Sequence, residues 1–121
     1  MIIATSPKEL ILIYHSDMSF AEKLLAYAAA EGLALREIDL KKENLAAIDW
    51  EEIVEKLQIS FKDLVNYEHP DFESKYGNYE ALNEEDWLKV LLHNPEFLAH
   101  PIAIKGDKIK IIDIYSKLTE F

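Results

Sequence analysis

The first clear hydrophobic pattern in the chain is Leu10–Tyr14, an uncharged apolar run that stops at the polar loop His15–Met18. A short continuous apolar run is typical of a strand buried on both faces. From Ser19 the apolar positions recur with helical spacing as far as Gly32, a residue type that commonly ends helices. Leu33–Leu40 alternates and predicts a second strand, parallel to the first because a helix connects the two.

The middle of the chain, about residues 44–98, predicts a helical insert. Asp49–Leu57 has acids in its first turn and the pattern of a helix. Ser60 begins a further capped start, and Asn83 predicts the N-cap of a helix that Asn94, which precedes a proline, would end. The polar and aromatic stretch between them contains a proline and a glycine, so we expect only short helices there.

The last part of the chain predicts a hairpin. Two alternating segments, Pro101–Lys105 and Lys108–Ile112, flank Gly106 and Asp107, and a glycine-first two-residue loop is a hairpin signal. A short helix follows from about Asp113. The order is β-α-β, helical insert, β-β-α, which is the thioredoxin plan. We therefore expect an α/β, thioredoxin-like fold with a mixed sheet flanked by helices, in one domain over residues 1–121.

Composition excludes several kinds of chemistry. The chain has 121 residues, 50% of them hydrophobic, and no cysteine, which rules out disulfides, thiolate metal sites and every cysteine nucleophile. The net charge of −10, with basic residues interleaved among acids, argues against direct nucleic-acid binding. No run approaches the roughly 20 apolar residues of a membrane span, and the N-terminus does not read as a signal peptide. We expect a cytoplasmic protein with no membrane partner.

Three stretches, ILIYHSDMS, ISFKDLV and LLHNPEFLAHPIAIKGDKI, resemble the arsenate reductase and Spx family of thioredoxin-fold proteins. The resemblance spans about Leu10 to Phe121, and HNPEFLAHPI is its most specific part. It implies a cysteine at the position of Ser19, an arginine at that of His100 and another arginine near Asn66. All three residues differ here. Because a serine hydroxyl has a far higher pKa than a thiol, we expect neither arsenate reduction nor disulfide exchange.

The resemblance also implies a cis peptide bond before Pro101, beside the loop of residues 15–19. A cis bond needs tertiary support, and by this criterion a trans bond at this position would overturn the family assignment.

Ser19 has two interpretations. With Glu22 it has the spacing of a capping box at a helix start. Alternatively its hydroxyl is a nucleophile with His15 or His100 as the base. His15, Asp17 and His100 could also hold zinc or nickel, but their spacing matches no metal motif, and we expect no metal or cofactor. The helix N-terminus offers an anion site, which the missing arginines would leave weak.

Aromatic residues alternate with acids in the insert and have two interpretations: they cover the core, or they form an interface, where tyrosine is favoured. The candidates are Tyr67, Phe72, Tyr76 and Tyr79. His69 and His93 are expected at the surface.

Two hypotheses about function follow. The first is a non-catalytic, Spx-like or arsenate reductase-like module that binds another protein; the Spx branch implies transcription-related partners, and no residue identifies one. The second is a hydrolase, or a small-anion- or metal-binding protein, that reuses the loop through Ser19, His15 and His100.

Overall fold

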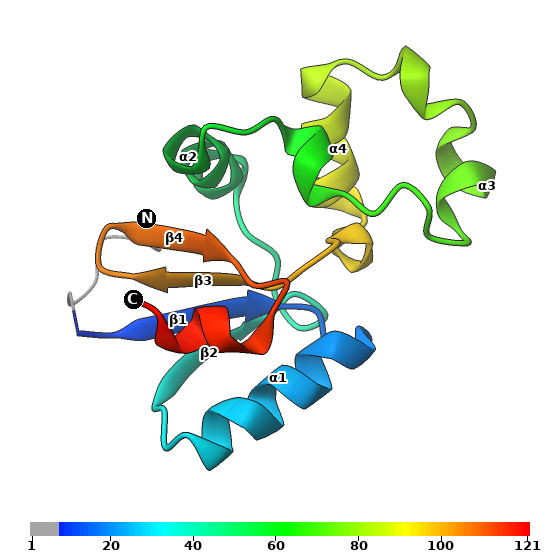
Figure 1. Ribbon diagram of the computed structural model, residues 1–121. Helices are drawn as coiled ribbons and strands as arrows, with labels where there is room; N and C mark the ends of the chain where they lie inside the picture. The colour runs from blue at the N-terminus through cyan, green and yellow to red at the C-terminus, as the bar shows by residue number, and fades with distance from the viewer. Residues whose placement is uncertain (1–7) are drawn as a thin grey trace.

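The computed structural model describes residues 8–121 and contains a mixed four-stranded sheet (Figure 1). The central strand β1 (Leu10–Tyr14) pairs in parallel with β2 (Leu35–Asp39) and antiparallel with β3 (Ile102–Lys105). β3 continues into β4 (Lys108–Ile111) through the expected tight turn, in which Lys105 pairs with Lys108. The strand order is β2-β1-β3-β4. The expected sheet and hairpin are therefore confirmed.

Helices cover both faces of this sheet. Helix α1 (Ser19–Ala30) lies on one side, together with the C-terminal 3₁₀ helix Tyr115–Thr119, whose Leu118 packs in the same cluster as Leu24. Helices α2 (Ala47–Leu57) and α4 (Glu84–His93) lie on the other side (Figure 1). The sheet thus separates two hydrophobic clusters.

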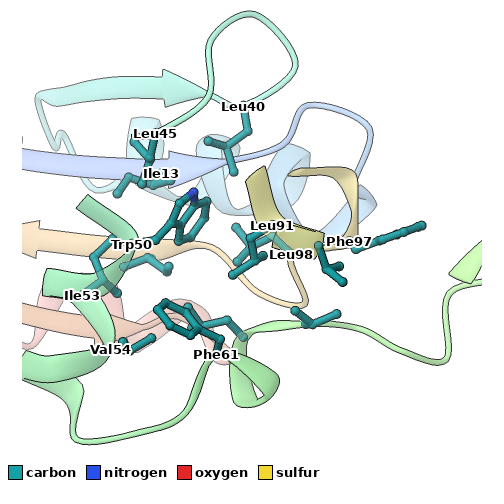
Figure 2. Close-up of a cluster of buried hydrophobic side chains, with 14 of the residues drawn as sticks. Ile13, Leu40, Leu45, Trp50, Ile53, Val54, Phe61, Leu91, Phe97 and Leu98 are labelled. Carbon is teal, nitrogen blue, oxygen red and sulfur yellow. The ribbon is translucent and has the colours of Figure 1, made fainter. Parts of the chain in front are cut away.

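Strand β1 supplies side chains to both clusters, as its unbroken apolar run predicts. Leu10, Leu12 and Tyr14 pack toward α1, whereas Ile11 and Ile13 pack toward the insert. Successive side chains of a strand point to opposite faces. All five are buried because a hydrophobic cluster covers each face of the sheet. The larger cluster contains Trp50, Phe61 and Phe97 among others (Figure 2).

The insert between β2 and β3 also contains the short helix α3 (Phe72–Tyr76) and several 3₁₀ turns. Backbone hydrogen bonds join the middle of the insert to its C-terminal end: the N–H of Asn66 donates to the carbonyl of Phe97 at 2.7 Å, and the N–H of Ala99 to the carbonyl of Leu64 at 2.8 Å. These bonds hold the chain around residue 66 beside the segment that leads into β3.

The N-cap predicted at Asn83 is confirmed, whereas the one predicted at Ser19 is not. The Asn83 side chain accepts from the N–H of Asp86, as expected. Ser19 is instead the first residue of α1, and the N-cap position is taken by Met18, with no side-chain cap. Because the N–H of Met18 donates to the carbonyl of His15 at 3.0 Å, a tight turn makes Met18 the extended residue before the helix. The expected Ser19–Glu22 capping box is wrong.

The expected cis bond before Pro101 is also wrong. Residues 8–121 contain no cis peptide bond. Pro101 is buried, and its carbonyl accepts from the N–H of Ile112 at 2.8 Å, so it joins the hairpin with a trans bond. The trans form is the default unless surrounding structure forces the alternative, and only the resemblance argued for a cis bond. The criterion that the resemblance set at Pro101 therefore fails, and the likeness to the family rests on the fold as a whole.

Candidate functional site

A hollow of about 420 Å³ lies between the loop that follows β1 and the insert. His15, Asp17 and Ser19 line one side of it, and Asn66 and His69 line the other. We call this hollow the loop pocket. It brings together three of the residues singled out in the sequence around the start of α1.

His100 and Pro101 are not among the residues that line the loop pocket. The His100 side chain is exposed, and its ring meets Phe20 edge-on with the ring centres 6.5 Å apart. His100 therefore lies near the first turn of α1 but is not placed as a base toward Ser19.

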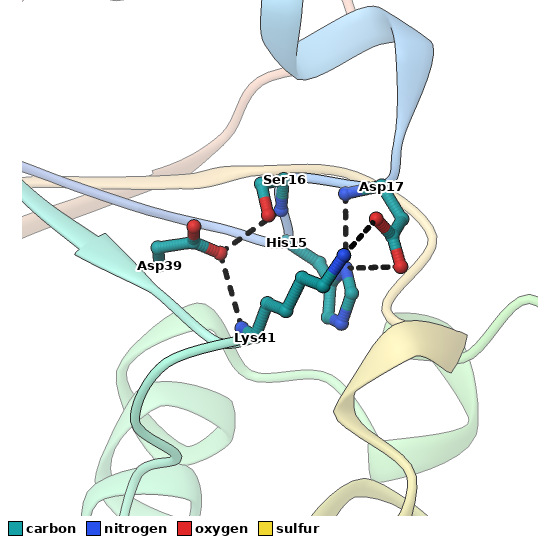
Figure 3. Close-up of polar contacts among 5 residues, drawn as sticks. All are labelled: His15, Ser16, Asp17, Asp39 and Lys41. Atoms are coloured by element: carbon teal, nitrogen blue, oxygen red, sulfur yellow. Dashed lines mark hydrogen bonds and ion pairs between the residues drawn. The ribbon is translucent and has the colours of Figure 1, made fainter.

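The loop after β1 is fixed by the carboxylate of Asp39 at the end of β2 (Figure 3). Its Oδ1 accepts from the N–H of Ser16 and the N–H of Lys41, each at 3.0 Å. The two parallel strands end side by side, which brings these groups together. Burial acts to raise the pKa of Asp39, but the hydrogen bonds from Lys41 and Ser16 outweigh it and hold the pKa below its ordinary value.

An ion pair ties the same loop to the residues after β2. Lys41 Nζ lies 2.9 Å from Oδ1 of Asp17 (Figure 3). This hydrogen bond lowers the pKa of the Asp17 carboxyl and raises the pKa of Lys41. Both side chains are well exposed, so the pair orients Asp17 more than it stabilises the fold.

His15 is the buried polar residue of the loop pocket, with 5% of its surface exposed. Its Nδ1 accepts a hydrogen bond from the N–H of Asp17 at 3.1 Å. A ring nitrogen that accepts carries no hydrogen, so in the neutral imidazole the hydrogen is assigned to Nε2. Figure 3 shows Nε2 pointing away from Asp17, and within residues 8–121 no group hydrogen bonds to it.

His69 repeats this arrangement on the opposite side of the pocket. Its Nδ1 accepts from the N–H of Asp71, also at 3.1 Å, and its ring is tilted against Phe97 with centres 4.9 Å apart. The His69 side chain is half-buried and lines the pocket. The sequence predicted only that it lies at the surface and did not place it at the site. The signal was present: His15-Ser16-Asp17 and His69-Pro70-Asp71 share the pattern His-x-Asp.

The aromatic residues of the insert pack mostly against one another. Phe72 is 1% exposed and stacks on Trp87, with ring centres 5.7 Å apart, so it belongs to the core. Tyr67 and Tyr79 are half-buried and stack at 4.5 Å. The hydroxyl of Tyr76 accepts from the side-chain amide of Asn94 at 2.6 Å. Three of the four candidates, the tyrosines, therefore keep part of their surface exposed.

Two further hollows continue from the loop pocket along the insert. One, of about 310 Å³, shares Asn66 and Ala99 with the loop pocket. The other, of about 450 Å³, shares Tyr67 with the hollow of 310 Å³ and is also lined by Tyr79. The three hollows are therefore neighbours that share lining residues on one part of the molecule.

Residues 8–121 contain neither a cluster of metal-ligating side chains nor a membrane-spanning helix. Within these residues no group of three histidine, aspartate or glutamate side chains is arranged to hold a metal ion. In the same part of the chain, none of the helices has the length and apolar character that a bilayer span requires.

Comparisons with known proteins show similarity in structure only. No family model and no curated protein sequence matches the chain. Solved structures do match. A Yersinia pestis protein assigned as an arsenate reductase has a TM-score of 0.80 at 14% identity, and the match covers 93% of this chain and 100% of the other. Arsenate reductase from Vibrio cholerae has a TM-score of 0.78 at 12% identity, over 93% and 97%.

A third structure, an arsenate reductase related protein from Brucella melitensis, has a TM-score of 0.72 at 13% identity, over 97% of this chain and 99% of the other. These identities are too low to show more than the fold. The match nevertheless runs over nearly the whole of each chain. This protein therefore has the thioredoxin-like fold of the arsenate reductases, carried by a sequence without a single cysteine.

Proposed function

We propose that this chain is a cysteine-less member of the arsenate reductase and Spx family that acts in the cytoplasm by binding another protein. The observation that carries the proposal is the residue at the start of α1. The resemblance places the reactive cysteine of the family at Ser19, which is exposed at the first position of the helix. Its hydroxyl cannot take part in thiol exchange.

The surroundings of Ser19 support a role without catalysis. A serine nucleophile needs a base within hydrogen-bond reach. Nδ1 of His15 already accepts from Asp17, and His100 packs against Phe20 outside the pocket. Within residues 8–121 no hydrogen bond joins Ser19 to a histidine. The hydrolase alternative therefore has less support than the binding role.

These neighbouring hollows support the binding of a protein. They run from the loop pocket past Asn66 to the stacked pair Tyr67 and Tyr79, and Nζ of Lys62 lies 5.5 and 5.3 Å from the centres of these two rings. Half-buried tyrosines beside a shallow surface are residues that protein interfaces favour.

The proposal is tested with the full chain carrying an affinity tag. Wild type, Tyr79→Ala and Tyr27→Ala are used to retain proteins from native cytoplasm. Tyr27 is the matched control because it is also half-buried and stacks on a tyrosine, Tyr115, with centres 5.9 Å apart, but on the α1 side of the sheet. We expect a protein retained by wild type and Tyr27→Ala and lost with Tyr79→Ala.

Circular dichroism checks that each variant is folded. Equal retention by all three proteins would contradict the use of this surface. Arsenate turnover by the wild-type protein, with or without added thiols, would contradict the non-catalytic role itself.

A further inference from the structure

The loop pocket has a charge opposite to that of an oxyanion site. Asp17, Asp71 and Glu96 line it, and within the described part of the chain none of its lining residues is a lysine or an arginine. The Asp17 carboxylate is paired with Lys41 at 2.9 Å, and Glu96 lies 3.7 Å from Nζ of Lys75.

The carboxylate of Asp71 differs from the other two. Its backbone N–H donates to His69 and its carbonyl accepts from Ser74, but within residues 8–121 its carboxylate makes no ion pair or hydrogen bond. Asp71 therefore offers the pocket a carboxylate that no lysine or arginine of the described chain pairs with. A cationic group is the complement of such a position.

His15 provides a second and independent indication of a ligand. It is 5% exposed, it lines the loop pocket, and its Nε2 has no partner within the described residues. Since Nδ1 accepts from Asp17, the free nitrogen is a donor. The ring is buried, but among the described residues only Nε1 of Trp50 is a side-chain nitrogen or oxygen that is both buried and without a partner, so Nε2 of His15 keeps access to solvent. This nitrogen can therefore donate to a ligand that brings a carbonyl oxygen.

These two features together disfavour a metal ion and favour a polypeptide. A metal would need the lone pair of Nε2, which carries the hydrogen while Nδ1 accepts. A peptide segment supplies a carbonyl for the His15 donor and, on a lysine or arginine, a cation for Asp71. The hollows that continue past Asn66 to Tyr67 give such a segment room to extend.

We propose that the loop pocket binds a lysine or arginine side chain on an extended segment of the partner protein, an inference that rests on the proposed function. The cation faces Asp71, and a backbone carbonyl of the segment accepts from Nε2 of His15. The net charge of −10 attracts basic partners over longer distances and raises the rate of encounter.

The test is an NMR titration of the ¹⁵N-labelled full chain with a capped pentapeptide, acetyl-Ala-Ala-Lys-Ala-Ala-amide, at low salt. The matched peptide has norleucine in place of lysine, which keeps the methylene chain and removes the charge. We expect saturable shifts of the amide signals of Asp17, Ser19, His69 and Asp71 with the lysine peptide only.

Two variants locate the binding charge. Asp71→Asn should weaken binding of the lysine peptide about 2- to 5-fold, as for other partly exposed ion pairs, and Asp71→Lys should abolish it. Asp107→Asn is the control, because Asp107 is exposed in the hairpin turn outside the pocket and the substitution changes the net charge equally. It should leave the affinity unchanged.

Four results would overturn the inference: no saturable shifts, equal binding of the norleucine peptide, equal weakening by Asp71→Asn and Asp107→Asn, or inorganic phosphate shifting the same amides to saturation. If the Tyr79-dependent partner is still retained while the peptide fails to bind, only this inference falls. Turnover of arsenate by the wild-type protein would instead contradict the proposed function.

Discussion

Asn83 and Asp86 cap the start of α4 reciprocally: the Asn83 side chain accepts from the Asp86 N–H at 2.8 Å, and the Asp86 carboxylate accepts from the Asn83 N–H at 3.0 Å. This exchange satisfies two backbone donors that a helix start otherwise leaves free. Helix α4 in turn buries Trp87, Val90 and Leu91 against the insert side of the sheet. The cap is therefore coupled to the larger hydrophobic cluster.

Asn83→Ala should destabilise the protein by about 1 kcal/mol, because the Asp86 N–H loses its acceptor. Asn83→Ser keeps a capping oxygen and should cost much less. Denaturant titration measures both free energies of unfolding. Equal losses for the two variants would show that the cap does not contribute.

Ser19→Ala should change the free energy of unfolding by less than about 0.5 kcal/mol, as for ordinary exposed positions. Ser19 is exposed, it occupies the first helical position, and its side chain does not cap α1. The Ser19–Glu22 spacing of a capping box would by itself predict a larger loss of stability. The same titration decides, and a loss as large as that of Asn83→Ala would restore a capping role for Ser19.

Trp50 is fully buried in the cluster of Figure 2, and its Nε1 has no hydrogen-bond partner within residues 8–121. Trp50→Ala should cost about 3–5 kcal/mol through the cavity it leaves. Trp50→Phe should cost less than half of that, because it keeps a ring in the cluster and removes the unpaired N–H. Thermal or denaturant unfolding tests this order. A Phe variant as unstable as the Ala variant would contradict it.

Asp39 should give the protein part of its acid sensitivity. Its pKa is lower in the folded chain than in the unfolded chain, so its contribution to stability is present above the ordinary aspartate pKa of about 3.9 and is lost as the pH falls through the folded value. Asp39→Asn should be less stable than wild type at pH 7, with the gap narrowing below about pH 4. Urea titrations across this range measure the gap, and a constant gap would contradict the assignment.

Ser19→Cys should place a reactive thiol at the N-terminus of α1, where the helix dipole lowers the pKa of a cysteine. Iodoacetamide labelling should be faster than for an unstructured peptide thiol. The variant should still not reduce arsenate, since Asn66 and His100 stand where the resemblance implies arginines and carboxylates line the pocket. Turnover by this variant would show that an oxyanion site survives.

The sequence by itself determined most of the fold. The apolar run Leu10–Tyr14 is typical of a strand buried on both faces, and Gly106, with its φ of 62°, makes a turn that glycine adopts without strain. Asn94 with the following proline ends α4 at His93. These features depend on local backbone preferences and hydrophobic periodicity, which are written in neighbouring residues.

Tertiary structure decided the site. Whether Ser19 or Met18 caps α1 depended on the turn closed by His15, and Phe72 became core because Trp87 lies against it. Nothing in the spacing of His15 and His69 along the chain places them in one pocket. Backbone hydrogen bonds that join the middle of the insert to its C-terminal end hold the chain near His69 beside the pocket that His15 also lines. Contacts between residues far apart in sequence depend on how whole elements pack, and local propensity contains no information about that packing.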